Sequence, residues 1–427
     1  MISSRPRWAH GHLLTLCLLV CGIALSLTGA ARASVARDAR HHRVRTRAAS
    51  KHRARGAARP RHVHHTYVIR TAAAVAAARA SDSSPIGQLG AQGPASPSQE
   101  VAPAPAEPAQ EARTEEQTPQ TVSFQPGINS GSAAVWELPG AAQLGAKVVR
   151  VAVPIEETAA NFQPVVAAYA EKGIRVALLV CFDGTLPTPA QAKNLATWAG
   201  AYGPGGSFWS KHAGGQYAIE TIEFGNETSF GYQYADDSPA GYASRAQTYA
   251  LRFAEAASAI RTANPEVGLL AQGDSGNAGP IWVESMFKAV PDLGSLVAGW
   301  TVHPYGPNWR AKLEELVSQT AAQGAPPSIP IDVTEWGLTS DNGRCLSENY
   351  GWNPCMSYQE AAEALSRTVG EMRQALDGRL GQLLLYQIRD QKPSGQSSNR
   401  EDYFGALQRE LQPKGAYTGA VEALLAS

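Results

Sequence analysis

The stretch Ile-Glu-Thr-Ile-Glu-Phe-Gly-Asn-Glu at residues 219–227 alternates apolar and polar side chains until it reaches a glycine. Such alternation is typical of a short β-strand, and the glycine predicts the strand's end. The strand would therefore present Asn226 and Glu227 at its carboxyl end. A second stretch of this kind, Ile-Pro-Ile-Asp-Val-Thr-Glu-Trp-Gly at 329–337, carries Glu335 near its end. The chain thus holds two glutamates at the carboxyl ends of two predicted strands.

Strand-like apolar runs alternate with longer helical segments through residues 121–427, a pattern typical of parallel βα units. We expect strands at 122–128, 147–153, 174–182, 219–225, 267–272, 296–302, 329–334 and 381–388. We expect helices at 133–144, 158–172, 189–202, 239–263, 281–290, 309–323, 357–376 and 417–425. Eight such units over roughly 300 residues predict an α/β fold, a (β/α)8 TIM barrel, whose strands all open at their carboxyl ends onto one face.

The first 33 residues predict a signal peptide. Arg5 and Arg7 precede an apolar run at 13–28, and Ala-Arg-Ala at 31–33 fits a small-x-small cleavage site. The run is shorter than the roughly 20 residues that a membrane-spanning helix needs. We therefore expect cleavage after Ala33 and a secreted or envelope-associated protein, with an uncleaved N-terminal anchor as the alternative.

Residues 34–120 have the composition of a disordered region. The part at 34–80 is dense in His and Arg, and the part at 81–120 is rich in Pro, Ala, Gln, Ser and Glu, so neither is expected to bury enough apolar surface to fold. Of 37 basic and 37 acidic residues in the chain, 15 basic residues and one acidic residue lie in 1–80. This cationic tail is either a solvated linker or a means of attachment to an anionic envelope polymer. We expect no nucleic-acid partner and a monomer.

Polar and aromatic residues follow most of the predicted strands. In a barrel they would form one ring around the two glutamates, and we place Arg150, Asp183, His303, Tyr305 and Tyr386 in it. Two carboxylates that face one pocket are what cleavage of a glycosidic bond requires. The sequence therefore predicts a catalytic pair, Glu227 and Glu335.

Three motifs together resemble the clan A glycoside hydrolases, the retaining enzymes that include families 5, 30, 39 and 51. The motifs are Gly225-Asn226-Glu227, His303-Pro304-Tyr305 and Thr334-Glu335-Trp336-Gly337, on or after the fourth, sixth and seventh predicted strands. The resemblance covers residues 121–427 and leaves a family 5-like and a family 39-like enzyme equally open.

The resemblance implies that Glu227 is the acid/base and Glu335 the nucleophile. It also implies that Asn226 binds the sugar 2-hydroxyl, and that Arg150 and Tyr305 hold the nucleophile. Such an enzyme cleaves O-glycosidic bonds of a poly- or oligosaccharide by double displacement through a covalent glycosyl-enzyme. The ionised Glu335 needs a guanidinium nearby, whereas Glu227 needs surroundings that keep it protonated near neutral pH.

Further substrate contacts are predicted around this pair. They come from His303, which is equally open to a structural reading, and from Trp336, Asp183 and Tyr386, the last where a stacking Trp is common in the family.

Cys345 and Cys355 flank the loop after the seventh strand, and in an oxidising compartment we expect them to form a disulfide. We find no phosphate-binding glycine loop and no cluster of metal ligands in the sequence of the body, so we predict neither cofactor nor metal. The alternative to a secreted glycosidase is a non-catalytic carbohydrate-binding or envelope protein that keeps the barrel and attaches through its basic tail. Sugar identity, linkage, and endo or exo action stay open.

Overall fold

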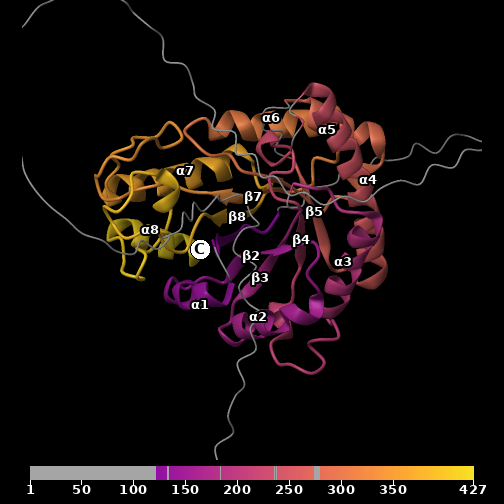
Figure 1. The fold of residues 1–427 in the computed structure, drawn as a ribbon, viewed down its shortest axis with the longest axis horizontal. Coiled ribbons are helices and arrows are strands. Elements are labelled where there is room, and N and C mark those ends of the chain that lie inside the picture. Colours follow the sequence, from indigo (N-terminus) through magenta and orange to yellow (C-terminus); the bar gives the residue numbers. More distant parts are fainter. Residues whose placement is uncertain (1–121, 132–133, 183, 235, 237, 274–278) are drawn as a thin grey trace, which may run out of the picture. The chain divides into compact units, whose positions relative to one another are not determined.

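The computed structural model describes residues 122–427 except 132–133, 183, 235, 237 and 274–278. The predicted signal peptide, the predicted disordered region at 34–120 and Asp183 therefore lie outside the described residues. The described part forms a closed barrel of eight parallel strands in the order β1 to β8, ringed by helices (Figure 1). The predicted TIM barrel is confirmed.

Strands and helices alternate as predicted. The strands are β1 (Gln125–Asn129), β2 (Val148–Pro154), β3 (Arg175–Cys181), β4 (Thr221–Phe224), β5 (Gly268–Gln272), β6 (Gly299–Val302), β7 (Ile331–Trp336) and β8 (Leu380–Leu385). The helices are α1 (Ala134–Gln143), α2 (Ala159–Glu171), α3 (Pro189–Tyr202), α4 (Pro239–Ala263), α5 (Ile281–Ala289), α6 (Trp309–Ala322), α7 (Tyr358–Ala375) and α8 (Ala416–Leu425). Strand β6 starts three residues later than expected, and the first residue of the predicted run, Leu296, caps the 3-10 turn at Leu293–Ser295.

The strands bury different side chains on their two faces. Outward-facing residues such as Ile222 and Phe224 of β4 join the large apolar cluster that also contains helix residues such as Phe253. The residues between them point into the barrel, as alternation along a strand requires. The interior therefore receives buried polar side chains, which are Asn129, Arg150, Glu223, Gln272, Thr301, Asp332, Thr334 and Gln382.

Two glycines make room for one of these polar side chains. A Cβ at Gly299 would lie 2.0 Å from Asp332 Oδ2, and one at Gly381 would lie 2.4 Å from Asp332 Oδ1. These contacts are far shorter than real carbon–oxygen contacts, so β6 and β8 need glycine beside this carboxylate. Asp332 Oδ1 accepts a hydrogen bond from the backbone N–H of Gln382 at 2.7 Å. The barrel is thus built around a buried acid below the level of the strand ends.

The C-terminal segment is fixed by a buried ion pair. Lys414 is completely buried, and its Nζ donates to Asp390 Oδ1 at 2.7 Å and to the carbonyl oxygens of Ser340 and Tyr403. Burial raises the pKa of Asp390 to about 7, although the charge of Lys414 opposes this. The pair connects the segments that follow β7 and β8 with the start of α8. Within the described residues, no helix is both long and apolar enough to cross a membrane.

Candidate active site

The end of β7 carries Glu335, whose carboxylate is held from two sides. Arg150 of β2 donates from Nη1 to Glu335 Oε2 at 3.0 Å, and the Tyr305 hydroxyl donates to Oε1 at 2.9 Å. The Glu335 side chain is 16% exposed. An oxygen pair with two donors and partial access to solvent suits a carboxylate that stays ionised and attacks a substrate.

Arg150 is buried in the barrel and uses all five of its N–H donors. Nε and Nη2 donate to the two oxygens of Glu223, Nη1 donates to Asn129 as well as Glu335, and Nη2 also donates to Asn226. Burial lowers the pKa of Arg150, but the negative charges of Glu223 and Glu335 outweigh it and raise that pKa above its ordinary value. Arg150 therefore orients the Glu335 carboxylate from below. All five donors have protein acceptors, and a contact of Arg150 with the substrate stays a prediction.

The turn after β4 places the second glutamate. Gly225 has a φ of +90°, and a Cβ there would lie 2.3 Å from Thr228 Oγ1, so the chain can bend sharply only with glycine at this position. Glu227 itself has a φ of 46°, which is uncommon for a residue with a side chain. Such a conformation is a reason to look for function at the residue that adopts it.

His303, which follows β6, connects Glu227 with the barrel interior. Its Nδ1 lies 3.1 Å from Glu227 Oε1, and its Nε2 lies 3.2 Å from Thr334 Oγ1. The charge of Glu335 and the hydrogen bond to Glu227 overcome the effect of burial and raise the pKa of His303. The His303 side chain is only 1% exposed and contacts Glu227, which favours the structural reading, and its contact with substrate stays a prediction.

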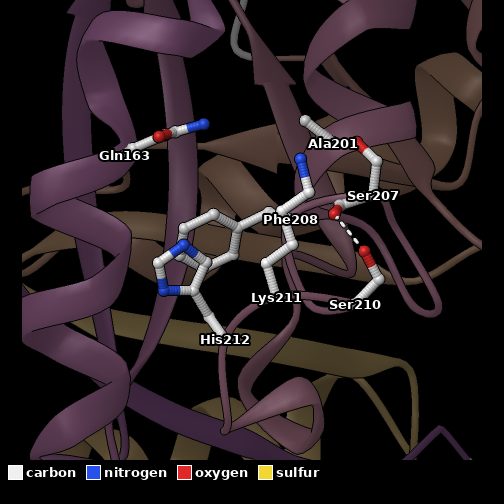
Figure 2. A pocket seen from close by; sticks show the side chains of 7 residues that line it. All are labelled: Gln163, Ala201, Ser207, Phe208, Ser210, Lys211 and His212. Carbon is white, nitrogen blue, oxygen red and sulfur yellow. Dashed lines mark hydrogen bonds between the residues drawn. The ribbon is translucent and has the colours of Figure 1, made fainter.

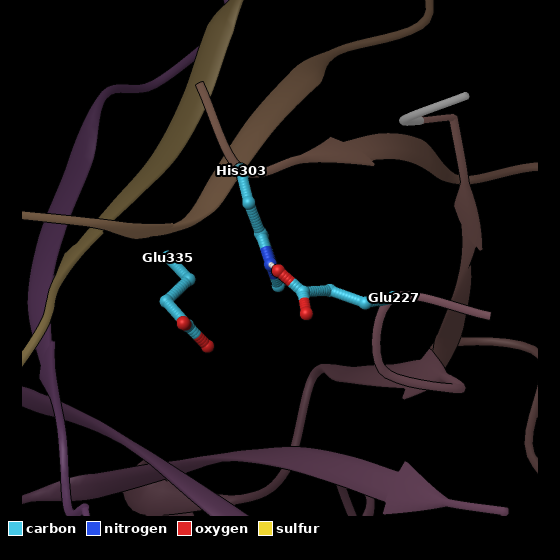
Figure 3. A group of neighbouring side chains, drawn as sticks. All are labelled: Glu227, His303 and Glu335. Carbon is cyan, nitrogen blue, oxygen red and sulfur yellow. Dashed lines mark hydrogen bonds and ion pairs between the residues drawn. The ribbon is translucent and has the colours of Figure 1, made fainter. Parts of the chain in front are cut away.

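The two glutamates converge. One carboxylate oxygen of Glu227, one of Glu335 and a ring nitrogen of His303 all lie within 4.8 Å of one another. Figure 3 shows the Glu227 carboxylate in front of the His303 ring and the Glu335 carboxylate directed towards the same space. Carboxyl groups in retaining glycosidases are about 5–5.5 Å apart, whereas inverting enzymes need about 6.5–9.5 Å to admit a water. One oxygen pair within 4.8 Å is compatible with the retaining separation.

These three residues have the donor types of a metal site, but their surroundings suit a different role. Arg150 places a positive charge 3.0 Å from Glu335, and a cation between the carboxylates would be repelled by it. The contact between His303 and Glu227 would also have to break. We therefore do not interpret the group as a metal site.

The other predicted site residues lie as follows. Asn226 is partly exposed and accepts from Arg150 at Oδ1, and its Nδ2 has no acceptor among the described residues, so it is available for a sugar hydroxyl. Tyr386 is partly exposed, and burial together with the charge of Glu335 raises its pKa well above the ordinary value. Its ring meets Phe404 edge-on at 5.3 Å.

Trp336 corrects a prediction. It is completely buried and belongs to the apolar cluster between barrel and helices, so it does not contact substrate. The reason is a register shift in the pairing of β7 with β8 between Val333 and Trp336. This bulge turns Glu335 towards Arg150 in the barrel interior and Trp336 outward.

Tyr305, whose hydroxyl donates to Glu335, is supported by neighbouring side chains. Tyr350 stacks on Tyr305 with ring centroids 5.0 Å apart, and the Arg400 guanidinium lies 3.6 Å from the centroid of the Tyr350 ring. The Tyr350 hydroxyl donates to Glu401 Oε1 at 2.8 Å. Tyr350 belongs to the loop closed by the predicted disulfide Cys345–Cys355, which is present. The loop therefore braces Tyr305 beside Glu335.

Sequence reasoning missed Glu223 and Thr334. Both are buried strand residues, and the Thr334 hydroxyl donates to Glu223 Oε1 at 2.8 Å. The alternation in 219–227 contained the signal for Glu223, because it puts Glu223 on the face opposite Ile222 and Phe224. A charged residue on the inner face of a barrel strand needs a partner inside the barrel.

A separate surface cavity of about 250 Å³ lies on the outer side of the barrel, between α2 and the segment after α3 (Figure 2). Its lining residues are Gln163, Ala201, Ser207, Phe208, Ser210, Lys211 and His212. The rings of Phe208 and His212 stack at 4.1 Å. None of the residues around Glu227 and Glu335 lines this cavity.

Comparison with known proteins gives similarity in fold. No protein-family model matches the sequence, and no curated protein matches it significantly. A family 39 glycoside hydrolase from Bacteroides cellulosilyticus is similar in structure, with 16% identity and a TM-score of 0.48 over 71% of this chain and 63% of that one. GH5_18 from Streptomyces cattleya in complex with GlcNAc is similar as well, with 16% identity and a TM-score of 0.49. That match covers 72% of this chain and 80% of that one.

A β-glucuronidase from Bacteroides uniformis is also similar, with 13% identity and a TM-score of 0.48, and the match covers 72% of this chain but 35% of that one. The chain thus spans less than two thirds of the first of these structures and about a third of the glucuronidase. Likeness at such identities concerns the fold alone. The chemistry of the site has to be inferred from its own residues.

Proposed function

We propose that this chain is a retaining glycoside hydrolase that cleaves O-glycosidic bonds of a poly- or oligosaccharide, with Glu335 as nucleophile and Glu227 as acid/base. The observation that carries the proposal is the pair of carboxylates whose nearest oxygens lie within 4.8 Å, with different partners. Arg150 and Tyr305 donate to Glu335, and His303 contacts Glu227. This difference separates an ionised nucleophile from a group that exchanges protons.

The reaction follows in two steps. In the first, Glu335 attacks the anomeric carbon, the glycosidic C–O bond breaks, and Glu227 gives its proton to the departing oxygen. In the second, Glu227 takes a proton from water as the water oxygen attacks the same carbon, and the ester bond to Glu335 breaks. Sugar and alcohol are released, and both glutamates regain their starting protonation. Asn226 would bind a sugar hydroxyl beside the reacting carbon.

Hydrolysis of a panel of aryl β-glycosides with different sugars tests the proposal. We expect activity on at least one sugar and a loss of at least about a thousandfold in Glu335→Gln, because the amide is no nucleophile. Glu314→Gln, which changes an exposed glutamate on α6, is the matched control and should keep the native rate. Equal rates for Glu335→Gln and the native chain would refute the assignment and leave the barrel as a binding protein.

Azide distinguishes the two glutamates. In Glu227→Ala, azide should attack the glycosyl-enzyme and give a β-glycosyl azide, because two inversions retain configuration. In Glu335→Ala, azide should enter the place of the missing carboxylate and give the α-glycosyl azide by one inversion. The same azide anomer from both variants would contradict the separate roles.

We further propose that the protein is exported. The predicted signal peptide at 1–33 supports this, as does the disulfide Cys345–Cys355, since structural disulfides persist in oxidising compartments. Attachment through the basic tail remains part of this proposal. The N-terminal residue of protein recovered from the medium should be Ser34, and recovery only of cell-bound protein that starts at Met1 would contradict cleavage.

A further inference from the structure

Glu223 lies among the buried polar side chains of the barrel interior and contacts the supports of both glutamates. It is buried, and its two oxygens accept from Arg150 Nε at 2.6 Å and Nη2 at 3.1 Å. Its Oε1 also accepts from the Thr334 hydroxyl at 2.8 Å. Arg150 also donates to Glu335, and Thr334 contacts His303, which in turn contacts Glu227. The Glu223 carboxylate is therefore connected to both Glu335 and Glu227.

The hydroxyl of Thr334 has a single proton, and this decides the state of His303. Because the carboxylate of Glu223 can only accept, the Thr334 proton must point to Glu223. Thr334 Oγ1 is then an acceptor towards His303 Nε2, 3.2 Å away. His303 therefore carries a proton on Nε2, and its Nδ1 is the atom that exchanges a proton with Glu227 at 3.1 Å.

On this geometry, and resting on the proposed function, we infer that Glu223 is a positioning residue that fixes the Nε2–H form of His303 through Thr334 and orients Arg150 under the nucleophile. Glu223 touches neither substrate nor reacting atoms. Its effect on Glu227 passes through His303, by way of the Thr334 hydroxyl and of Glu223 Oε1, which lies 4.0 Å from His303 Nε2. Its effect on Glu335 passes through Arg150. The two effects are separable, because Thr334 takes part only in the first.

The dependence of kcat/KM on the leaving group separates the effect of Glu223 on Glu227 from its effect on Glu335. A dinitrophenyl glycoside departs without a proton, whereas a phenyl glycoside needs the acid. Thr334→Val keeps the shape but removes the hydroxyl, so we expect kcat/KM to fall by about tenfold or more for the phenyl glycoside and by less than about threefold for the dinitrophenyl glycoside. Thr334→Ser should be close to native. Glu223→Gln should lower kcat/KM for both substrates, because it also releases Arg150.

Asp332→Asn is the matched control. Asp332 is another buried acid of the barrel interior. Its Oδ1 accepts from the backbone N–H of Gln382, and it is hydrogen-bonded to none of Glu223, Thr334 and His303. Asp332→Asn should keep the native ratio of kcat/KM for the phenyl glycoside to kcat/KM for the dinitrophenyl glycoside. Equal losses on both glycosides in Thr334→Val, or native rates in Glu223→Gln, would overturn the inference. If Glu223→Gln does not fold, the Thr334 variants carry the test.

A second readout needs no activity. Nitrogen NMR of the imidazole in the full chain should show the Nε2–H form of His303 in the native protein. In Glu223→Gln the amide N–H2 can donate to Thr334, which frees the Thr334 proton to point at Nε2, so the signals should shift towards the Nδ1–H form. Unchanged signals would overturn the inference. If the native chain hydrolyses none of the aryl glycosides, that result counts against the proposed function. The NMR result would still decide the role of Glu223.

Discussion

Replacement of Asp332 by Asn should change the pH dependence of stability by a predictable amount. Asp332 is completely surrounded by the barrel, and burial is the main cause that raises its pKa from 3.8 to about 7, with a smaller contribution from the charge of Glu223. One pKa unit corresponds to about 1.4 kcal/mol, so this rise corresponds to about 4 kcal/mol. The folded protein holds the proton more tightly than the unfolded chain.

The sign follows from linkage. A carboxyl group with a raised pKa in the folded state contributes stability below its unfolded pKa, and that contribution is lost as the pH rises through the folded pKa. Somewhat more than half of the total, about 3 kcal/mol, is lost between about pH 5 and about pH 8. The side-chain amide of the Asp332→Asn variant does not titrate, so the variant lacks this loss.

Urea unfolding at these two pH values measures the effect. The free energy of unfolding of Asp332→Asn minus that of the native chain should become more positive by about 3 kcal/mol from about pH 5 to about pH 8. Asp292→Asn, which removes an exposed carboxylate, controls for the loss of one negative charge. A difference that does not change with pH, or that changes in the opposite direction, would refute the account of a buried proton on Asp332.

Three further perturbations test the site and its supports. Tyr305→Phe removes the hydroxyl that donates to Glu335 at 2.9 Å, and we expect kcat/KM to fall by about tenfold with an unchanged melting temperature; a native rate would contradict its role. Lys414→Met leaves a buried carboxylate without its cation and should cost about 3–5 kcal/mol in urea unfolding, whereas a cost below about 1 kcal/mol would show that the pair is not needed. Replacement of both Cys345 and Cys355 by Ser opens a loop of sequence separation 10 and should cost about 2–3 kcal/mol in stability. It should also lower kcat, because the loop braces Tyr305, and an unchanged kcat would separate the disulfide from catalysis.

The barrel could be predicted from the sequence because its signals are local. Alternation within 219–227 and the apolar runs of the other strands mark βα units, and eight such units close in only one common way. The convergence of Glu227 and Glu335 follows from the same topology, since all strands end on one face. Strand ends shifted by a few residues, as where Leu296 at the start of a predicted strand instead caps the turn Leu293–Ser295.

The sequence was least informative about the direction in which single side chains point. Trp336 follows a bulge, and without the register of β7 against β8 the sequence gives no means to see that Glu335 turns inward and Trp336 outward. For His303 the sequence allowed both a structural role and a contact with substrate. Its partners Glu227 and Thr334 become apparent only in the three-dimensional structure. Glu223 could have been found, because an acid between Ile222 and Phe224 must face the barrel interior and Arg150 alternates in the same way on β2.

The two glutamates are supported in different ways, and this difference bears on how the site works. Glu335 sits on a strand, and Arg150 reaches it from within the barrel. Glu227 stands beyond the end of β4 in a left-handed conformation, and the barrel reaches it through His303. A nucleophile must keep its charge and position through both steps, whereas the acid/base changes protonation twice in each cycle. A rigid ion pair suits the first task, and a histidine that can take up or release a proton suits the second. The buried carboxylate of Glu223 connects the two supports, so a change at this one residue is expected to reach both glutamates.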